Sequence, residues 1–241
     1  MEKNIQIRTA DGKNIEGILT GSITKPLIVL IHGLCGNMNE ALHYNAARFF
    51  EKNNFSSFRF NLYSWRKNFR KLHECTLKTH GQDLDTVLKF LEKKGAKKIA
   101  VVGHSYGLPS ILSSTNRNFS SVVSWDGSYL PLKYFRNLKK TSNPKGVLLD
   151  EGYLTIMGEG MVKESEKLNS DQLVKNLKKP IKFITVSGKN NGNLVGAQKM
   201  LKVALGPKEI KVINGATHNF TEYGKQEILY KETLNFIKKF V

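Results

Sequence analysis

The chain has 241 residues, 40% of them hydrophobic, a length that suits one large domain or a core with a small insertion better than two equal domains. Its 38 Lys and Arg outnumber its 20 Asp and Glu, giving a net charge of +18, but they lie in scattered clusters and not along the aromatic-lined stripe of a nucleic-acid-binding face. No segment has membrane-spanning length, the first residues lack the apolar stretch of a secretory signal, and Cys35 and Cys75 match no metal-ligand spacing, so we expect a cytoplasmic protein with free thiols.

The first half of the sequence alternates between short apolar runs and amphipathic segments. Residues 5–9 and 15–19 alternate apolar and polar side chains around the turn pair Asp11-Gly12, which favours a hairpin. Residues 27–31 are apolar at every position, as in a parallel strand covered on both faces. The further elements predicted in this half are a helix over 39–52, a strand over 56–61, a helix over 79–94, a strand over 98–102, a helix ending near 114 and a strand over 121–125.

The regular pattern is interrupted after residue 127. Between residues 128 and 179 the apolar residues keep no single period, and residues 146–157 are compatible with a hairpin, so we interpret 128–179 as a small inserted lid. The alternation then resumes with a strand over 181–187, a helix over 194–205, a strand over 209–213 and an amphipathic helix over 225–240. The sequence therefore predicts an α/β fold with a mostly parallel twisted sheet and helices on both faces, whose core is formed by 1–127 and 180–241.

A candidate nucleophile lies in the turn after the predicted strand at 98–102. Residues 103–107 read Gly-His-Ser-Tyr-Gly, so a glycine stands two positions on either side of Ser105 and permits a tight turn from which the hydroxyl projects. Residues 32–36 read His-Gly-Leu-Cys-Gly and follow the first buried strand, where the Leu34 N–H is able to point towards Ser105. The Tyr106 N–H, at a helix N-terminus, is the second predicted donor to an oxyanion, and His32 is expected to shape the loop.

A serine hydroxyl is a poor nucleophile and needs a general base beside it. His218, in the loop after the last predicted strand, is the candidate base. The remaining histidines lie in or beside predicted helices or in the two glycine-rich turns, and no spacing among them indicates a metal site. We therefore expect neither a metal nor a cofactor.

These motifs resemble those of the α/β-hydrolase superfamily, and the chain length is similar to that of its small lidded esterases and monoglyceride lipases. The resemblance spans nearly the whole chain and rests on residues 32–36, residues 103–107, the Ser187-Gly188 strand exit and residues 215–218. It implies a serine hydrolase that cleaves a carboxylic ester or a related acyl bond of a small molecule through an acyl-enzyme on Ser105.

The sequence departs from the family pattern at the position of the catalytic acid. In the family the acid usually lies about three residues beyond a glycine such as Gly188, and this position holds Asn191. Three interpretations stay open. In the first, Asp126, at the exit of the 121–125 strand, is the acid, as in some lipases of this fold; the alternative role for Asp126 is to cap a turn. In the second, Asn191 orients His218 without a charge. In the third, the site binds a ligand without catalysing a reaction.

The predicted lid is rich in apolar side chains, most of which we expect in the core of the lid and some against an acyl group. They are Tyr129, Leu130, Leu132, Tyr134, Phe135, Tyr153, Leu154, Ile156 and Met157. Asp150 and Glu151 are remoter candidates for the acid. The positive charge favours a weak association with anionic surfaces or charged esters, but no specific nucleic acid.

Overall fold

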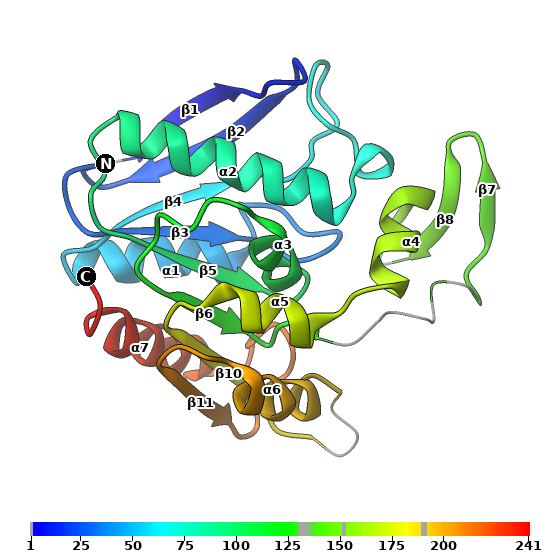
Figure 1. Ribbon diagram of the computed structural model, residues 1–241. Helices are drawn as coiled ribbons and strands as arrows, with labels where there is room; N and C mark the ends of the chain where they lie inside the picture. The colour runs from blue at the N-terminus through cyan, green and yellow to red at the C-terminus, as the bar shows by residue number, and fades with distance from the viewer. Residues whose placement is uncertain (1, 130–134, 136, 151–152, 189–191) are drawn as a thin grey trace.

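The structure is a computed structural model that describes residues 2–129, 135, 137–150, 153–188 and 192–241. The strands of its large sheet are β1 (Glu2–Arg8), β2 (Asn14–Thr20), β3 (Leu27–Ile31), β4 (Ser56–Phe60), β5 (Ile99–His104), β6 (Val122–Trp125), β10 (Ile181–Val186) and β11 (Lys208–Ile213). They lie in the order β1-β2-β4-β3-β5-β6-β10-β11 (Figure 1). The β1–β2 and β2–β4 pairs are antiparallel and the other pairs are parallel.

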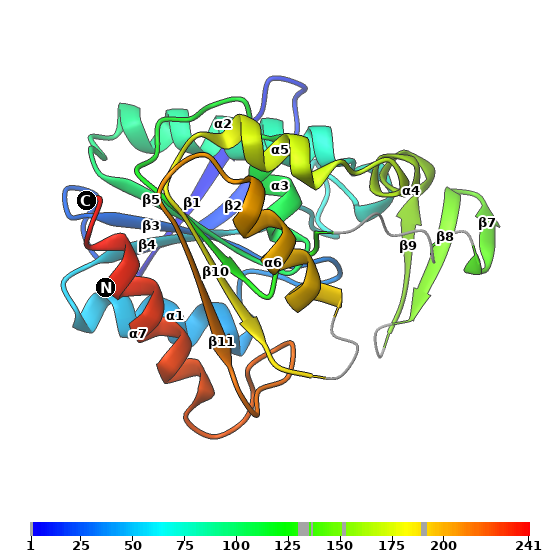
Figure 2. The same cartoon turned by 60° about the horizontal axis from the view of Figure 1, so that its bottom comes forward.

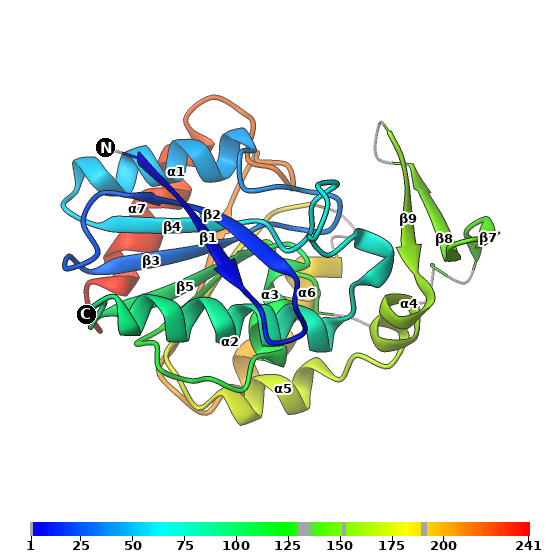
Figure 3. The ribbon, with the colours of Figure 1, turned by 90° about the horizontal axis from the view of Figure 1, so that it is seen from above.

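Helices cover both faces of this sheet, as Figure 3 shows from above. One face carries α1 (Ala41–Lys52) and α7 (Lys225–Ile237), and the other carries α2 (Leu77–Lys93), α3 (Gly107–Ser113), α5 (Ser170–Leu177) and α6 (Gly192–Val203). Every residue of β3, β5, β6 and β10 is buried, because both faces of these strands are covered. This burial explains why their sequences are almost continuously apolar.

A small antiparallel sheet stands beside the large one (Figures 1 and 2). It consists of β7 (Lys140–Ser142), β8 (Lys145–Asp150) and β9 (Leu154–Gly158), and is followed by α4 (Glu159–Glu166). β9 packs on the short 3-10 helix η1 (Leu72–Glu74), and Val147, Met157 and Met161 share one buried cluster with Leu77 and Tyr106. The small sheet is therefore tied to the Ser105 turn through Tyr106.

The predicted α/β fold is confirmed. The 5–9 and 15–19 runs form the antiparallel pair β1–β2 with Ile7 opposite Ile15, and the 146–157 hairpin corresponds to β8–β9. The helices α4 and α5 fall in the stretch where no period was found, and α5 packs on the core through Val174 and Leu177. The division into a core and a 128–179 lid stays a prediction. In the part of the chain that the structure describes, no helix combines the length and apolar character needed to cross a membrane.

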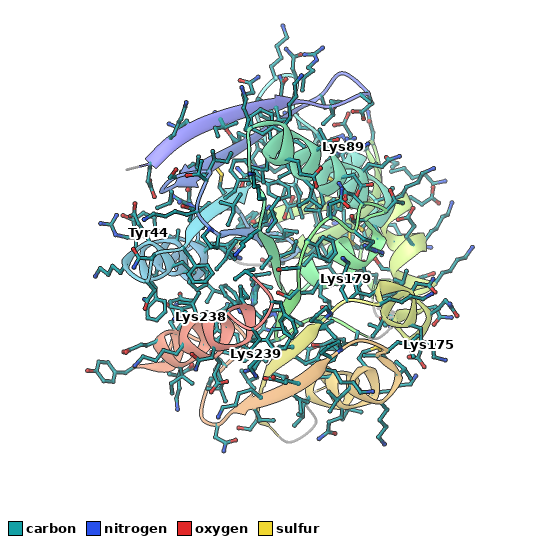
Figure 4. The ribbon with its side chains drawn as sticks, turned by 60° about the vertical axis from the view of Figure 1, so that its left-hand side comes forward. Tyr44, Lys89, Lys175, Lys179, Lys238 and Lys239 are labelled. Atoms are coloured by element: carbon teal, nitrogen blue, oxygen red, sulfur yellow. The ribbon has the colours of Figure 1, made fainter. Side chains whose placement is uncertain are left out.

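Lysines gather at the edge of the large sheet where its parallel strands begin. Figure 4 views this side and labels several of them, with their side chains directed outward. Lys179 lies just before β10, and Lys238 and Lys239 follow α7. Helices between parallel strands end at this edge, and their C-terminal ends favour cations.

The side chain of Trp125 joins the large sheet to α7. Its indole Nε1–H donates to Thr233 Oγ1 at 2.8 Å, and both residues are fully buried. We predict that Thr233→Val, which leaves this N–H without an acceptor, lowers the free energy of unfolding by about 1–3 kcal/mol, measured by urea denaturation.

Thr86→Val in α2 is the matched control for this variant. The Thr233 hydroxyl donates to the carbonyl of Leu229, four residues earlier in α7. The Thr86 hydroxyl likewise donates to the carbonyl of Gln82, four residues earlier in α2, but this bond is exposed. We expect it to change the free energy of unfolding by less than about 0.5 kcal/mol. Equal losses for the two variants would contradict the role given to the Trp125 hydrogen bond.

Candidate active site

The predicted site residues meet at the edge of the sheet where the parallel strands end. Ser105 directly follows β5, Asp126 directly follows β6, and His218 lies in the loop after β11. All three line a cavity of about 820 Å³, together with Leu34 and Tyr106. This edge is where open α/β sheets bind their ligands.

The backbone at Ser105 adopts a left-handed conformation, with φ of +52°. The turn is possible because glycines flank it: a Cβ atom on Gly107 would lie 2.6 Å from the carbonyl oxygen of Ile31, and one on Gly103 would lie 2.7 Å from the backbone of Gly107. The Ser105 N–H donates to the Trp125 carbonyl at 2.9 Å. The sequence motif thus forms the tight strand-to-helix turn that it predicts.

The loop over residues 32–36 passes directly against Ser105. A Cβ atom on Gly33 would lie 3.0 Å from the Cβ of Ser105, and Leu34 follows. His32 holds the loop, because its Nδ1 donates to the Gly33 carbonyl at 2.8 Å and its Nε2 accepts from the Leu62 N–H at 3.1 Å. Burial lowers the pKa of His32 to about 4, so the ring is neutral at pH 7. The oxyanion roles of Leu34 and Tyr106 stay predictions.

His218 and Asp126 are hydrogen-bonded to each other. The His218 Nδ1–H donates to Asp126 Oδ2 at 2.5 Å. The His218 side chain is 43% exposed and that of Asp126 only 2% exposed, so the imidazole reaches the cavity while its partner is buried. This is the arrangement that the first interpretation of the acid requires.

Three further donors surround the Asp126 carboxylate. Oδ1 accepts from the Thr185 hydroxyl at 2.7 Å and from the Val186 N–H at 3.3 Å, and Oδ2 accepts from Asn193 Nδ2 at 3.0 Å. Burial raises the pKa of Asp126, but the hydrogen bonds from His218, Thr185 and Asn193 outweigh it and hold the pKa below its ordinary value. Asp126 is therefore charged at neutral pH.

Asn191 lies outside the described residues, so its predicted role is not addressed by the structure. Its neighbour Asn193, at the start of α6, contacts Asp126 twice, since its amide also donates to the Asp126 carbonyl at 3.1 Å. Sequence reasoning missed Asn193 because its partner is 67 residues away. The available signal was a polar residue at the start of the helix that follows β10, the strand next to β6.

His104 packs against His218 and is hydrogen-bonded to its backbone. Its Nε2–H donates to the His218 carbonyl at 3.0 Å, and the two ring centroids are 4.7 Å apart. Burial is the main cause that lowers the pKa of His104 to about 3, so the His104 ring is neutral at pH 7. Among the described residues, no group of three or more His, Cys, Asp or Glu side chains is arranged to hold a metal ion.

The apolar residues of the predicted lid divide into buried and exposed ones. Phe135 and Met157 lie in the cluster of the small sheet, and Tyr129 lies in the core of the large one. Tyr153 and Leu154 are 51% and 66% exposed, and Tyr153 lines the cavity. Leu130, Leu132 and Tyr134 fall outside the described residues.

Residues 22–114 match a family described as "Putative serine esterase (DUF676)". This stretch contains the 32–36 loop and the Ser105 turn. A search of curated proteins found no match.

Several solved structures are similar over nearly the whole chain. Est1E from Butyrivibrio proteoclasticus, bound to ferulic acid, has a TM-score of 0.79 and 16% identity, over 97% of this chain and 99% of that one. The α/β-hydrolase GrgF from a Penicillium species has a TM-score of 0.81 and 12% identity, over 100% and 99% of the two chains. An esterase from Pyrococcus furiosus has a TM-score of 0.72 and 20% identity, over 100% and 91%. The chain has the α/β-hydrolase fold.

The low pKa of Asp126 predicts a contribution to stability that depends on pH. A carboxylate whose pKa is lower in the folded than in the unfolded chain stabilises the fold above its ordinary pKa of 3.8, and this contribution is lost as the pH falls through the folded value. Between about pH 6 and about pH 2.5 we therefore expect the free energy of unfolding to fall more for the wild type than for Asp126→Asn. Urea denaturation at each pH measures this, and parallel profiles would contradict it.

Proposed function

We propose that this chain is a serine hydrolase that cleaves a carboxylic ester or a related acyl bond of a small molecule. The observation that carries the proposal is the 2.5 Å hydrogen bond from His218 to Asp126 in the cavity that Ser105 also lines. The serine esterase family that residues 22–114 match supports it, as does the similarity to esterases of the same fold. In this proposal Asp126, and not Asn191, is the acid.

The first half of the reaction forms an acyl-enzyme. Ser105 Oγ attacks the carbonyl carbon of the ester while His218 accepts its proton, and the Leu34 and Tyr106 N–H groups stabilise the oxygen that becomes negative. His218 then gives the proton to the departing alkoxide as the bond between carbon and the leaving oxygen breaks. The buried charge of Asp126 stabilises the imidazolium that forms in between.

The second half releases the acyl group to water. His218 takes a proton from the water molecule, whose oxygen bonds to the carbonyl carbon. The bond to Ser105 Oγ then breaks, and His218 returns the proton to Ser105. The products are a carboxylic acid and an alcohol, and the protein regains its starting protonation state.

The division into a core and a 128–179 lid belongs to the same proposal. Tyr153, in the segment between β8 and β9, lines the cavity and donates a hydrogen bond to the Cys35 carbonyl. Cys35 lies in the loop over residues 32–36, which we call the oxyanion loop. In this view the lid comprises the whole of 128–179, in which β7, β8, β9 and α4 form one part and α5 packs on the core helices. Cys35 and Cys75 form no disulfide, which fits a cytoplasmic location, where the basic surface associates only weakly with anionic surfaces.

An activity-based probe tests the nucleophile. A fluorophosphonate is expected to label Ser105, and p-nitrophenyl butyrate is expected to give a burst of nitrophenol, because both react with an activated serine. Ser105→Ala should lose labelling and turnover. The control is Ser187→Ala, which removes another hydroxyl from the same cavity and should keep labelling. A wild-type protein with neither a burst nor labelling would exclude hydrolysis and favour a ligand-binding protein.

The identity of the acid is tested by comparing three variants that each remove a candidate side chain, and a fourth, Asn191→Asp, on the same ester. Asp126→Asn is expected to lower kcat by about three to four orders of magnitude, because an amide does not stabilise the imidazolium. Asn191→Ala and Asp150→Asn should each change kcat by less than about threefold if neither side chain is the acid. Equal small effects of all three would exclude Asp126 as the acid, and a rise in activity for Asn191→Asp would favour the Asn191 interpretation.

A further inference from the structure

We propose that Glu40 and Tyr153 form a subsite for a substituted ammonium group of the substrate, at the side of the cavity next to the oxyanion loop. The proposal rests on the esterase function above and adds to it the class of substrate. Both residues line the same cavity as Ser105. Neither has a part in the acyl-transfer steps.

The Glu40 carboxylate is held against the oxyanion loop. A Cβ atom on Gly36 would lie 2.7 Å from Glu40 Oε1, so the last glycine of the 32–36 motif makes room for this carboxylate. On its other side Glu40 Oε2 lies 3.5 Å from Nδ1 of the buried His43 ring. The carboxylate thus lies between Gly36 and His43, while 37% of the Glu40 side chain remains exposed and Glu40 lines the cavity.

Helix capping does not explain this position. Glu40 is the N-cap residue of α1, but its side chain accepts no capping hydrogen bond from the helix. Burial raises the pKa of Glu40, while His43 beside it and the more distant His32 and His104 lower it, and the pKa lies below its ordinary value. The cavity is therefore lined at neutral pH by a charged carboxylate that accepts no capping hydrogen bond from the helix.

Tyr153 brings an aromatic ring to the same part of the cavity. Its hydroxyl donates to the carbonyl of Cys35. Cys35 precedes Gly36, the residue that the Glu40 carboxylate lies against, so Tyr153 and Glu40 contact adjacent residues of the same loop. The ring is half-exposed and lines the cavity. A carboxylate and an aromatic ring that line one cavity are able to bind a substituted ammonium group together, by charge attraction and by the cation–π interaction.

The charges of the cavity agree with a cationic ligand. Its described lining residues include two carboxylates, Glu40 and Asp126, and neither lysine nor arginine. Asp126 is already hydrogen-bonded to His218, which leaves Glu40 to act on the substrate. A carboxylate on the substrate would be repelled here, whereas an ammonium group would be attracted.

Two matched pairs of esters test the subsite. The first is choline acetate and its neutral carbon isostere, with the charge in the leaving group. The second is the nitrophenyl ester of trimethylammonio-butyrate and its neutral carbon isostere, with the charge in the acyl group. We expect kcat/KM to favour the cationic member of at least one pair by about tenfold, and Glu40→Gln to remove most of that preference.

Glu51→Gln is the matched control, because it removes the same charge from the same helix, α1, at a residue that does not line the cavity. It should leave the ratio of the two kcat/KM values unchanged. Tyr153→Leu should lower the ratio by about threefold or more, and Tyr153→Phe, which keeps the ring, should lower it less. These two variants also test the subsite if Glu40→Gln does not fold.

A binding measurement separates this proposal from the esterase proposal. Choline itself is titrated against the wild type and Glu40→Gln by calorimetry, and we expect the variant to bind about tenfold more weakly. If Ser105 is not labelled by a fluorophosphonate but choline binds in this way, the hydrolase proposal fails and the subsite stands. The subsite is overturned if the neutral ester of each pair is used at least as well, or if Glu40→Gln and Glu51→Gln change the ratio or choline binding equally.

Discussion

The burial of one charged carboxylate organises the site. An ionised group taken out of water costs several kcal/mol unless donors replace its hydration. For Asp126 those donors come from three separate segments: Thr185 and Val186 in β10, Asn193 at the start of α6, and His218 after β11. The carboxylate is satisfied only when the three segments are correctly placed, so the same hydrogen bonds that offset its burial also orient the imidazole towards the cavity.

Backbone conformation adds a second constraint at the same edge of the sheet. Ser105 and Asp126 both have positive φ, +52° and +42°, and they follow the neighbouring strands β5 and β6. A left-handed conformation costs a non-glycine residue about 1–3 kcal/mol. Hydrogen bonds that extend the strands hold both residues, since Ser105 N–H donates to the Trp125 carbonyl and Asp126 N–H to the Ile184 carbonyl. The centre of the sheet thus fixes the positions of Ser105 and Asp126, to which the proposed function assigns the reaction.

Most of the large sheet was predictable from the sequence, because strands buried on both faces, such as β3, leave an unbroken apolar run that few other structures require. The 128–179 stretch was not, since α4 and α5 have eight residues each, too few turns for a period to emerge, and only tertiary packing distinguishes α5 on the core from α4 beside the small sheet. In the candidate site, local motifs were sufficient to select Ser105 and His218, which line one cavity. The preference for Asp126 depends on β10 lying beside β6, and Asn193, Glu40 and Tyr153 contact partners that no local pattern connects to them.

The net charge of the chain is positive, whereas the described residues that line the cavity include two carboxylates and neither lysine nor arginine. The architecture accounts for part of this difference. In a sheet of parallel strands the helices begin at the edge that carries the site and end at the other, so lysines that complement helix C-termini gather far from the cavity, as with Lys179 and Lys238 (Figure 4). Part of the net charge of +18 therefore lies on the surface away from the site. If the proposed subsite holds, substrate preference depends on the charges of the cavity lining, where screening is weaker than at the surface, and there Glu40 has more influence than the excess of lysines.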